Sequence, residues 1–171
     1  MERPSFLNGF NSYWLMYMAS DPSTRAKVSE TFAKASKYGM NVARTWAFND
    51  GGAKPLQTSS GSYNQDMFKG LDYVVSEASK HGIHLILTLV NNWDGYGGKK
   101  QYVQWAREQG HSLNNDDEFF TNPIVKGYFK NYFECCPLYE FMNMRERELL
   151  GLDFLRVMMR NKDEKGVGGG N

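Results

Sequence analysis

The alternation of strand-like and helix-like segments up to Val90 constrains the fold of this chain most strongly. Its last member, Ile83–Val90, is an apolar run without polar alternation, which is typical of a strand covered on both faces. Strands that alternate with helices indicate βαβ units and a parallel sheet. The predicted elements in chain order are a strand over Asn8–Trp14, a helix from Asp21–Thr24 to about Tyr38, a strand over Asn41–Ala47, a helix from Asn64 or Asp66 to His81, and a strand over Ile83–Val90.

Capping residues and apolar spacing support the two helices. Asp21-Pro22-Ser23-Thr24 is a helix-start signal with Asp or Ser as the cap, and Gly39 ends that helix. The segment Asn49–Gly61, with Asp50-Gly51-Gly52 and Pro55, has the composition of a loop. The second helix has the clearest apolar stripe, formed by Met67, Leu71, Val74, Val75 and Ala78.

The pattern changes after Val90 and again near Tyr132. The segment after Val90 predicts a long loop, a helix over Lys99–Gln109, a short helix begun by Asp116-Asp117-Glu118, and a helix from Asn122-Pro123 to about Tyr132. The remaining residues are rich in Met and Arg and end in glycines. We therefore divide the chain into residues 1–132 and an irregular, poorly ordered tail, 133–171.

Composition excludes several classes of function. The 171 residues suffice for one domain, and 41% hydrophobic with 23% charged residues is globular composition. A net charge of +1 gives no basic excess for nucleic acid or an anionic membrane. No apolar run is long enough to span a bilayer, and Met1–Ser5 does not open a secretory signal. The adjacent Cys135 and Cys136 are poorly placed for an ordinary disulfide.

Common cofactor and nucleophile signatures are also missing. The glycine-containing loops match neither the dinucleotide nor the P-loop pattern. His81, His84 and His111 lack metal-ligand spacing, and we interpret them as structural. No serine or cysteine lies in a nucleophile-elbow context. We therefore predict neither a metal nor a cofactor.

The carboxyl end of each predicted strand carries an indole beside an amide or a guanidinium. The residues are Asn11 and Trp14, Arg44 and Trp46, and Asn91, Asn92 and Trp93. Ligands of parallel α/β folds bind at the carboxyl ends of strands. Indoles stack on sugar faces, while Asn and Arg bond hydroxyl and carboxylate groups, so this pattern favours a carbohydrate site.

Each of these residues also has a structural interpretation. Trp46 could fill the core, and Asn91 and Asn92 could shape the turn. Arg44 could pair with a helix acid on the surface, but its strand context favours burial, which would require a carboxylate partner.

Several ordered motifs resemble plant-type endo-β-mannanases of glycoside hydrolase family 5. The resemblance runs from about Phe6 to Tyr132. Its motifs, in order, are Phe10–Met16, Arg44–Phe48, Asp50–Gly52, Gly61–Asn64, Leu89–Trp93, Gly98–Tyr102 and Phe119–Asn122.

This resemblance implies a fold, a reaction and two residue roles. The fold is a (β/α)8 barrel, here truncated to about the first three βα units. The reaction is retaining hydrolysis of β-1,4-mannosidic bonds in mannan, galactomannan or glucomannan by two carboxylates. Arg44 matches the arginine that hydrogen-bonds the nucleophile, and Trp46 matches a substrate-binding tryptophan. Family members are usually secreted.

The sequence departs from the family pattern at the catalytic acids. The family's acid/base Glu lies in an Asn-Glu-Pro motif after strand four, and its nucleophile follows strand seven. No Asn-Glu-Pro occurs here, and Met144 stands where the acid should be in the segment Tyr139–Arg145. We expect this chain alone to be inactive. The alternatives are a non-catalytic carbohydrate-binding or non-functional barrel fragment, and a small α/β domain of unrelated function.

Overall fold

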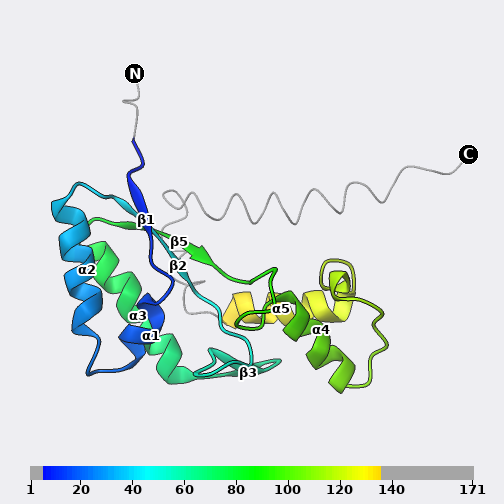
Figure 1. Cartoon of the computed structure of the whole chain (residues 1–171). Coiled ribbons are helices and arrows are strands. Elements are labelled where there is room, and N and C mark those ends of the chain that lie inside the picture. The colour runs from blue at the N-terminus through cyan, green and yellow to red at the C-terminus, as the bar shows by residue number, and fades with distance from the viewer. Residues whose placement is uncertain (1–5, 136–171) are drawn as a thin grey trace, which may run out of the picture.

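A three-stranded parallel sheet forms the centre of the fold. The computed structural model describes residues 6–135 (Figure 1). Strands β1 (Gly9–Asn11), β2 (Val42–Trp46) and β5 (His84–Thr88) lie side by side in that order, and both pairs are parallel. Neighbouring strands are also consecutive βα units of the chain, which is the arrangement from which a (β/α) barrel is built. The α/β expectation is confirmed, and the structure agrees with part of a barrel.

Three helices cover one face of this sheet. They are α1 (Leu15–Ser20), α2 (Ala26–Lys37) and α3 (Gln65–Lys80), and Figure 1 shows them grouped together. Their apolar residues form one core with the sheet, which includes Leu15, Val28, Phe32, Ala43, Val74 and Ile83. The predicted helices therefore form because their apolar stripes are buried against the strands.

The two long helices begin differently. The Asn64 side chain accepts hydrogen bonds from the N–H groups of Asp66 and Met67, at 3.1 and 3.4 Å, so the predicted cap of α3 is confirmed. Before α2, the Asp21 carboxylate instead accepts from the backbone and hydroxyl of Ser23, at 2.9 and 2.7 Å. The Asp21 side chain thus stabilises the preceding turn, and α2 starts five residues later, at Ala26.

The remaining elements form a hairpin and a second helical group. Strands β3 (Gln57–Ser59) and β4 (Ser62–Tyr63) pair antiparallel across a turn with Gly61 at φ +80°. Helices α4 (Lys99–Glu108) and α5 (Pro123–Cys135) pack together with the 3-10 helix η1 (Asp116–Phe119). Their shared core includes Tyr102, Val103, Trp105, Phe119 and Val125.

The sheet face opposite α1, α2 and α3 is largely open. Asn11, Arg44 and Ile86 are paired across the three strands and therefore point to the same face. All three are exposed, Ile86 by 40%. The expected burial of Arg44 and the expected cover on both faces of β5 are therefore wrong. The helices described within residues 6–135 cover the other face, so in this part of the chain the open face lacks the packing that closure into a barrel would supply.

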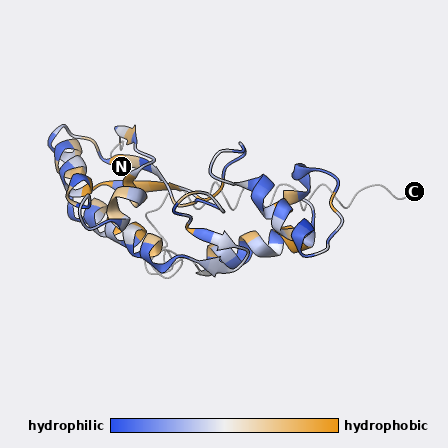
Figure 2. Ribbon diagram, turned by 60° about the horizontal axis from the view of Figure 1, so that its bottom comes forward, coloured by the Kyte–Doolittle hydropathy of each residue, from blue (hydrophilic) through white to orange (hydrophobic). Residues whose placement is uncertain are grey.

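The helices are amphipathic, in agreement with this arrangement. Figure 2 shows that the helices carry both hydrophilic and hydrophobic residues, as expected for amphipathic segments. Within residues 6–135, no helix has the length and apolar content needed to cross a membrane.

The predicted boundary near Tyr132 lies inside a helix. Helix α5 continues to Cys135, and Tyr132 itself is fully buried. The rest of the predicted tail, including Tyr139–Arg145, lies outside the described residues, so the division at residue 132 stays a prediction.

Gly70 on α3 allows a close approach of α1, and we expect Gly70→Ala to destabilise the fold. A Cβ at Gly70 would lie 2.7 Å from the Ser20 nitrogen and 2.9 Å from the Met16 carbonyl oxygen, both backbone atoms. Overpacking of this kind costs about 1–3 kcal/mol. Gly127→Ala in α5 is the matched control, because nothing lies within 4 Å of its added methyl group. Urea unfolding of both variants tests this, and equal stabilities would contradict it.

Candidate functional site

The structure brings Asn11, Arg44 and Trp46 together at the carboxyl ends of β1 and β2. Asn11 lies opposite Arg44 in the register of the two strands, and Trp46 follows two residues further along β2 on the same face. Asn11 and Arg44 are exposed, and Trp46 is half-buried. An amide, a guanidinium and an indole thus border one open surface.

Trp46 belongs to a group of aromatic rings. Its ring centroid lies 5.0 Å from that of Tyr13, after β1, and 5.0 Å from that of Tyr96, in the loop after β5. Tyr13 is 51% and Tyr96 46% exposed, whereas Phe48, also 5.0 Å from Trp46, is buried beneath. We call Tyr13, Trp46 and Tyr96 the aromatic platform. Partly exposed rings of this kind offer apolar faces that suit the C–H face of a sugar.

Trp14 and Asn91 make contacts within the fold. The sequence alone did not decide between a structural and a ligand-binding role for them. Trp14 precedes α1 and packs against the core between the helices and the sheet. The Asn91 amide donates to the Gly95 carbonyl at 2.8 Å, and its oxygen accepts from the Trp93 N–H at 3.1 Å. Asn91 therefore shapes its loop, which was the alternative interpretation.

Asn92 and Trp93 follow Asn91 and are exposed, Trp93 by 78%. The Trp93 side chain thus projects into solvent. Ligand contacts by Asn11, Trp14, Trp46, Asn91, Asn92 and Trp93, and the supporting role of Arg44, stay predictions.

Arg44 stands on the open face as a free cation within the described part of the chain. No carboxylate of residues 6–135 forms an ion pair with its guanidinium. A guanidinium offers five donors for a carboxylate or for hydroxyl groups. This geometry agrees with a partner that lies outside the described residues or in a ligand.

Asp50 is a buried carboxylate, which the sequence placed in a loop and in the motif Asp50–Gly52 without a role in the site. Its Oδ2 accepts a hydrogen bond from the Gly98 N–H at 3.2 Å, and its own N–H donates to the Tyr96 carbonyl at 3.0 Å. Burial raises the pKa of Asp50 from its ordinary value of 3.8 to about 7, although the Gly98 bond and the nearby Tyr102 hydroxyl act in the opposite direction.

Two neighbouring tyrosines share the buried environment of Asp50. Burial and the nearby Tyr96 and Asp50 raise the pKa of Tyr17 to about 12, so its phenol stays neutral near pH 7. Burial and Asp50 likewise raise the pKa of Tyr102. Among residues 6–135, no group of three His, Cys, Asp or Glu side chains is placed to hold a metal ion.

Comparison with known proteins places this geometry in a family. The model of the family described as "GH family 5 beta-mannosidase-like" matches residues 2–164. Mannan endo-1,4-beta-mannosidase 4 of Solanum lycopersicum is 67% identical over 126 residues, covering 74% of this chain and 32% of the relative. Mannan endo-1,4-beta-mannosidase 1 of Oryza sativa subsp. japonica is 59% identical over 130 residues, covering 75% and 30%.

A solved structure gives the same fold. A variant of the glycoside hydrolase family 5 mannosidase from Rhizomucor miehei, in complex with mannosyl-fructose, aligns with a TM-score of 0.66 and 22% identity. The alignment covers 75% of this chain and 37% of that protein. At this identity the likeness establishes the fold, part of a (β/α) barrel.

The chain belongs to the GH family 5 beta-mannosidase-like family, as its motifs indicated. It spans about a third of the length of the curated relatives it matches.

Proposed function

We propose that this chain carries part of the sugar-binding surface of a β-1,4-mannan endo-hydrolase. The relatives named above are mannan endo-1,4-beta-mannosidases, and three of the family motifs, Phe10–Met16, Arg44–Phe48 and Leu89–Trp93, lie at or just after the carboxyl ends of β1, β2 and β5. Mannan, galactomannan or glucomannan is the proposed ligand. Secretion, which the resemblance implied, stays a prediction.

The aromatic platform is the observation that carries this proposal. Trp46 contacts Tyr13 and Tyr96, which come from the ends of two other βα units, and the exposed Asn11 and Arg44 lie on the same side of the sheet. Pyranose rings are bound by such a combination, because their C–H faces pack on aromatic rings while their hydroxyl groups take up polar donors and acceptors.

Arg44 has a second role in the proposal. A fixed guanidinium beside a carboxylate lowers the pKa of that carboxylate and keeps it ionised, as a retaining nucleophile requires. The second carboxyl group of a retaining enzyme, the acid/base, must stay protonated for the first step. Arg44 is suited to the first task in the whole enzyme, and in the described part of this chain it has no carboxylate to pair with.

We also propose that the chain alone does not hydrolyse mannan, because its 171 residues contain no Asn-Glu-Pro motif for the acid/base Glu. Purified chain incubated with β-mannan should release no new reducing ends above a boiled control. Production of reducing ends that is abolished by Arg44→Ala would contradict this expectation.

Trp46→Ala is expected to weaken binding of mannohexaose to the chain by about five- to thirtyfold, since a stacking ring contributes on the order of 1–2 kcal/mol. Calorimetric titration of the 171-residue chain measures this. Tyr38→Ala is the matched control, because Tyr38 is a 68% exposed ring at the end of α2, away from the carboxyl ends of the strands. Equal losses in both variants, or no binding by the unaltered chain, would contradict the proposal.

A non-catalytic sugar-binding role is the second candidate, favoured by the exposure of Tyr13 and Tyr96 in the chain as it stands. It predicts mannohexaose binding that depends on Trp46 in the absence of any hydrolysis. The two candidates differ in whether the chain gains hydrolytic activity when the remaining two thirds of a related enzyme is supplied.

A further inference from the structure

We propose that Tyr96 is a second sugar-contacting ring beside Trp46, and that Asp50 is the positioning residue that fixes it there. The inference deepens the proposed function and rests on it for the identity of the ligand. It joins two residues that are distant in sequence and that the motif analysis did not connect. Tyr96 lies in the loop over residues 91–98, called here the Tyr96 loop.

Tyr96 has a backbone conformation that needs an external cause. Its φ of +63° lies in the left-handed region, which a residue with a bulky side chain rarely adopts. In this conformation its ring stands edge-on to Trp46, with 67° between the ring planes, and 6.2 Å from Tyr17. Nearly half of the Tyr96 surface remains exposed. The Tyr96 ring is thus held against Trp46 while part of its surface stays open to a ligand.

Asp50 supplies that cause through three contacts with the Tyr96 loop. Its N–H donates a hydrogen bond to the Tyr96 carbonyl, and its carboxylate accepts one from the Gly98 N–H. Asp50 therefore contacts the chain on both sides of Gly97. Gly97 itself passes so close that an added Cβ would lie 2.2 Å from the Asp50 carbonyl oxygen. Contacts with Asp50, which lies 46 residues earlier in the chain, therefore fix the conformation of Tyr96.

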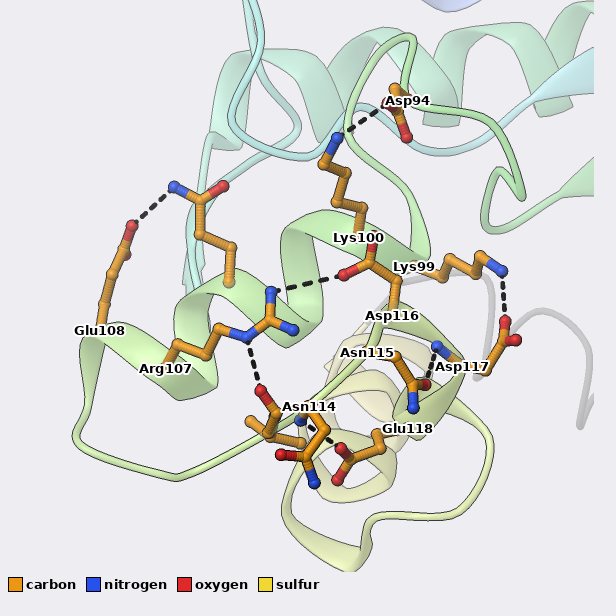
Figure 3. A network of polar contacts seen from close by, with 12 residues as sticks. Asp94, Lys99, Lys100, Arg107, Glu108, Asn114, Asn115, Asp116, Asp117 and Glu118 are labelled. Carbon is orange, nitrogen blue, oxygen red and sulfur yellow. Dashed lines mark hydrogen bonds and ion pairs between the residues drawn. The ribbon is translucent and has the colours of Figure 1, made fainter.

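The base of the Tyr96 loop is fixed independently. The Asn91 carbonyl accepts from the Lys99 N–H at 2.9 Å, and the Lys100 ammonium pairs with Asp94 at 2.8 Å. Figure 3 shows Lys100 reaching from α4 to Asp94, above the ion pairs that join α4 to the η1 segment. The Asn91–Lys99 bond closes the loop at its base, and the bonds to Asp50 place the segment that carries Tyr96.

The burial of Asp50 supports a role beyond packing. A buried carboxylate without a cationic partner opposes folding, and none of the described lysines or arginines pairs with Asp50. A buried acid that weakens the fold is more common at sites of function than in an ordinary core. Here it faces Tyr102 from α4 and Tyr17 from α1.

The test compares four variants of the 171-residue chain by calorimetric titration with mannohexaose at pH 6. Tyr96→Ala should weaken binding about tenfold. Asp50→Ala removes the side-chain bond to Gly98 but keeps the backbone bond to the Tyr96 carbonyl, so it should weaken binding by up to tenfold. The double variant should bind no more weakly than Tyr96→Ala, because Asp50 acts through Tyr96. Asp50→Asn keeps a side-chain oxygen for the Gly98 N–H and should bind within threefold of the unaltered chain. Asp66→Ala, at an exposed helix start, is the matched control.

Near-ultraviolet circular dichroism without sugar provides a readout independent of the ligand. The long-wavelength tryptophan bands, where tyrosine does not absorb, report the Trp46–Tyr96 contact through their change in Tyr96→Ala. Asp50→Ala should change these bands in the same direction, and Asp50→Asn should leave them unchanged. Far-ultraviolet spectra identify any variant that has simply unfolded, and in that case Asp50→Asn and Tyr96→Phe carry the comparison.

The outcomes separate this inference from the proposed function. If Trp46→Ala abolishes binding while Tyr96→Ala binds like the unaltered chain, the proposed function stands and the inference is wrong. If losses from Asp50→Ala and Tyr96→Ala multiply in the double variant, Asp50 does not act through Tyr96. If the unaltered chain binds no mannohexaose, the sugar-contacting role fails together with the proposed function, and the spectra of Asp50→Ala still decide whether Asp50 positions Tyr96.

Discussion

Replacing Asp50 with asparagine is expected to stabilise the fold above pH 7 by on the order of 4 kcal/mol relative to the unaltered chain. Burial raises the pKa of Asp50 from 3.8 to about 7, so the folded state favours the neutral acid. Below pH 4 the group is neutral in both the folded and the unfolded state. Between pH 4 and 7 only the unfolded state ionises, and stability falls as pH rises. Asparagine cannot ionise, so it removes this loss.

Urea unfolding at several pH values between 5 and 9 measures the effect. The difference in free energy of unfolding between Asp50→Asn and the unaltered chain should grow with pH up to about 7 and then level off. Asp66→Asn, at an exposed site, should show no comparable gain. A constant difference across the range would mean that Asp50 is not the group responsible.

Tyr132→Ala is expected to destabilise the fold by about 3–5 kcal/mol, as large truncations in a core do. Tyr132 is fully buried, and its hydroxyl donates to the Ala47 carbonyl at the end of β2. Its ring packs against Tyr63 and Phe129. The side chain therefore joins α5 to the sheet beside the candidate site. Because small domains are stable by only about 5–15 kcal/mol, this loss should be visible in thermal and urea unfolding.

Two conservative variants on α5 separate the contribution of the Tyr132 ring to stability from that of its hydroxyl. Tyr132→Phe keeps the ring and should cost about 1–2 kcal/mol, because a buried carbonyl loses its donor. Tyr128→Phe removes a hydroxyl that bonds the exposed Gln109 side chain, and should cost less. A Tyr132→Ala chain as stable as the unaltered one would show that α5 does not contribute to this core.

The sequence could predict elements whose signals are local. Helix α3 carries its apolar stripe and its Asn64 cap within adjacent residues, and both are present in the structure. Strands β2 and β5 and helix α4 lie within one or two residues of their predicted bounds. The order of βα units followed from this alternation, and the family followed from motifs that are contiguous in the chain.

Features that depend on contacts distant in sequence could not be predicted in this way. Helix α1 has only six residues, too few to show a helical period, and it forms where Gly70 of α3 lets it pack closely. The β3–β4 hairpin lies in a segment with ordinary loop composition. Arg44 was expected to be buried because the pattern of one strand does not tell whether anything packs on its second face.

The sequence predicted only part of the candidate site, because some of its residues depend on contacts that are distant in sequence. Trp46, Arg44 and Asn11 end neighbouring strands, so their proximity follows from the parallel sheet. Asp50 and Tyr96 were missed, because the burial of Asp50 depends on Gly98, 48 residues away. The glycines at 97 and 98 were the available signal, since close backbone approach is a common reason for paired glycines in a loop.

The most direct test of the central claim is a two-dimensional NMR titration of the isotope-labelled 171-residue chain with mannohexaose. We expect saturable shifts of the Trp46 indole N–H and of the amides of Asn11, Arg44 and Tyr96, with little change at Tyr38 at the end of α2. Absence of shifts, or shifts confined to the helical face formed by α2 and α3, would contradict the assignment of a sugar-binding surface to the carboxyl ends of these strands.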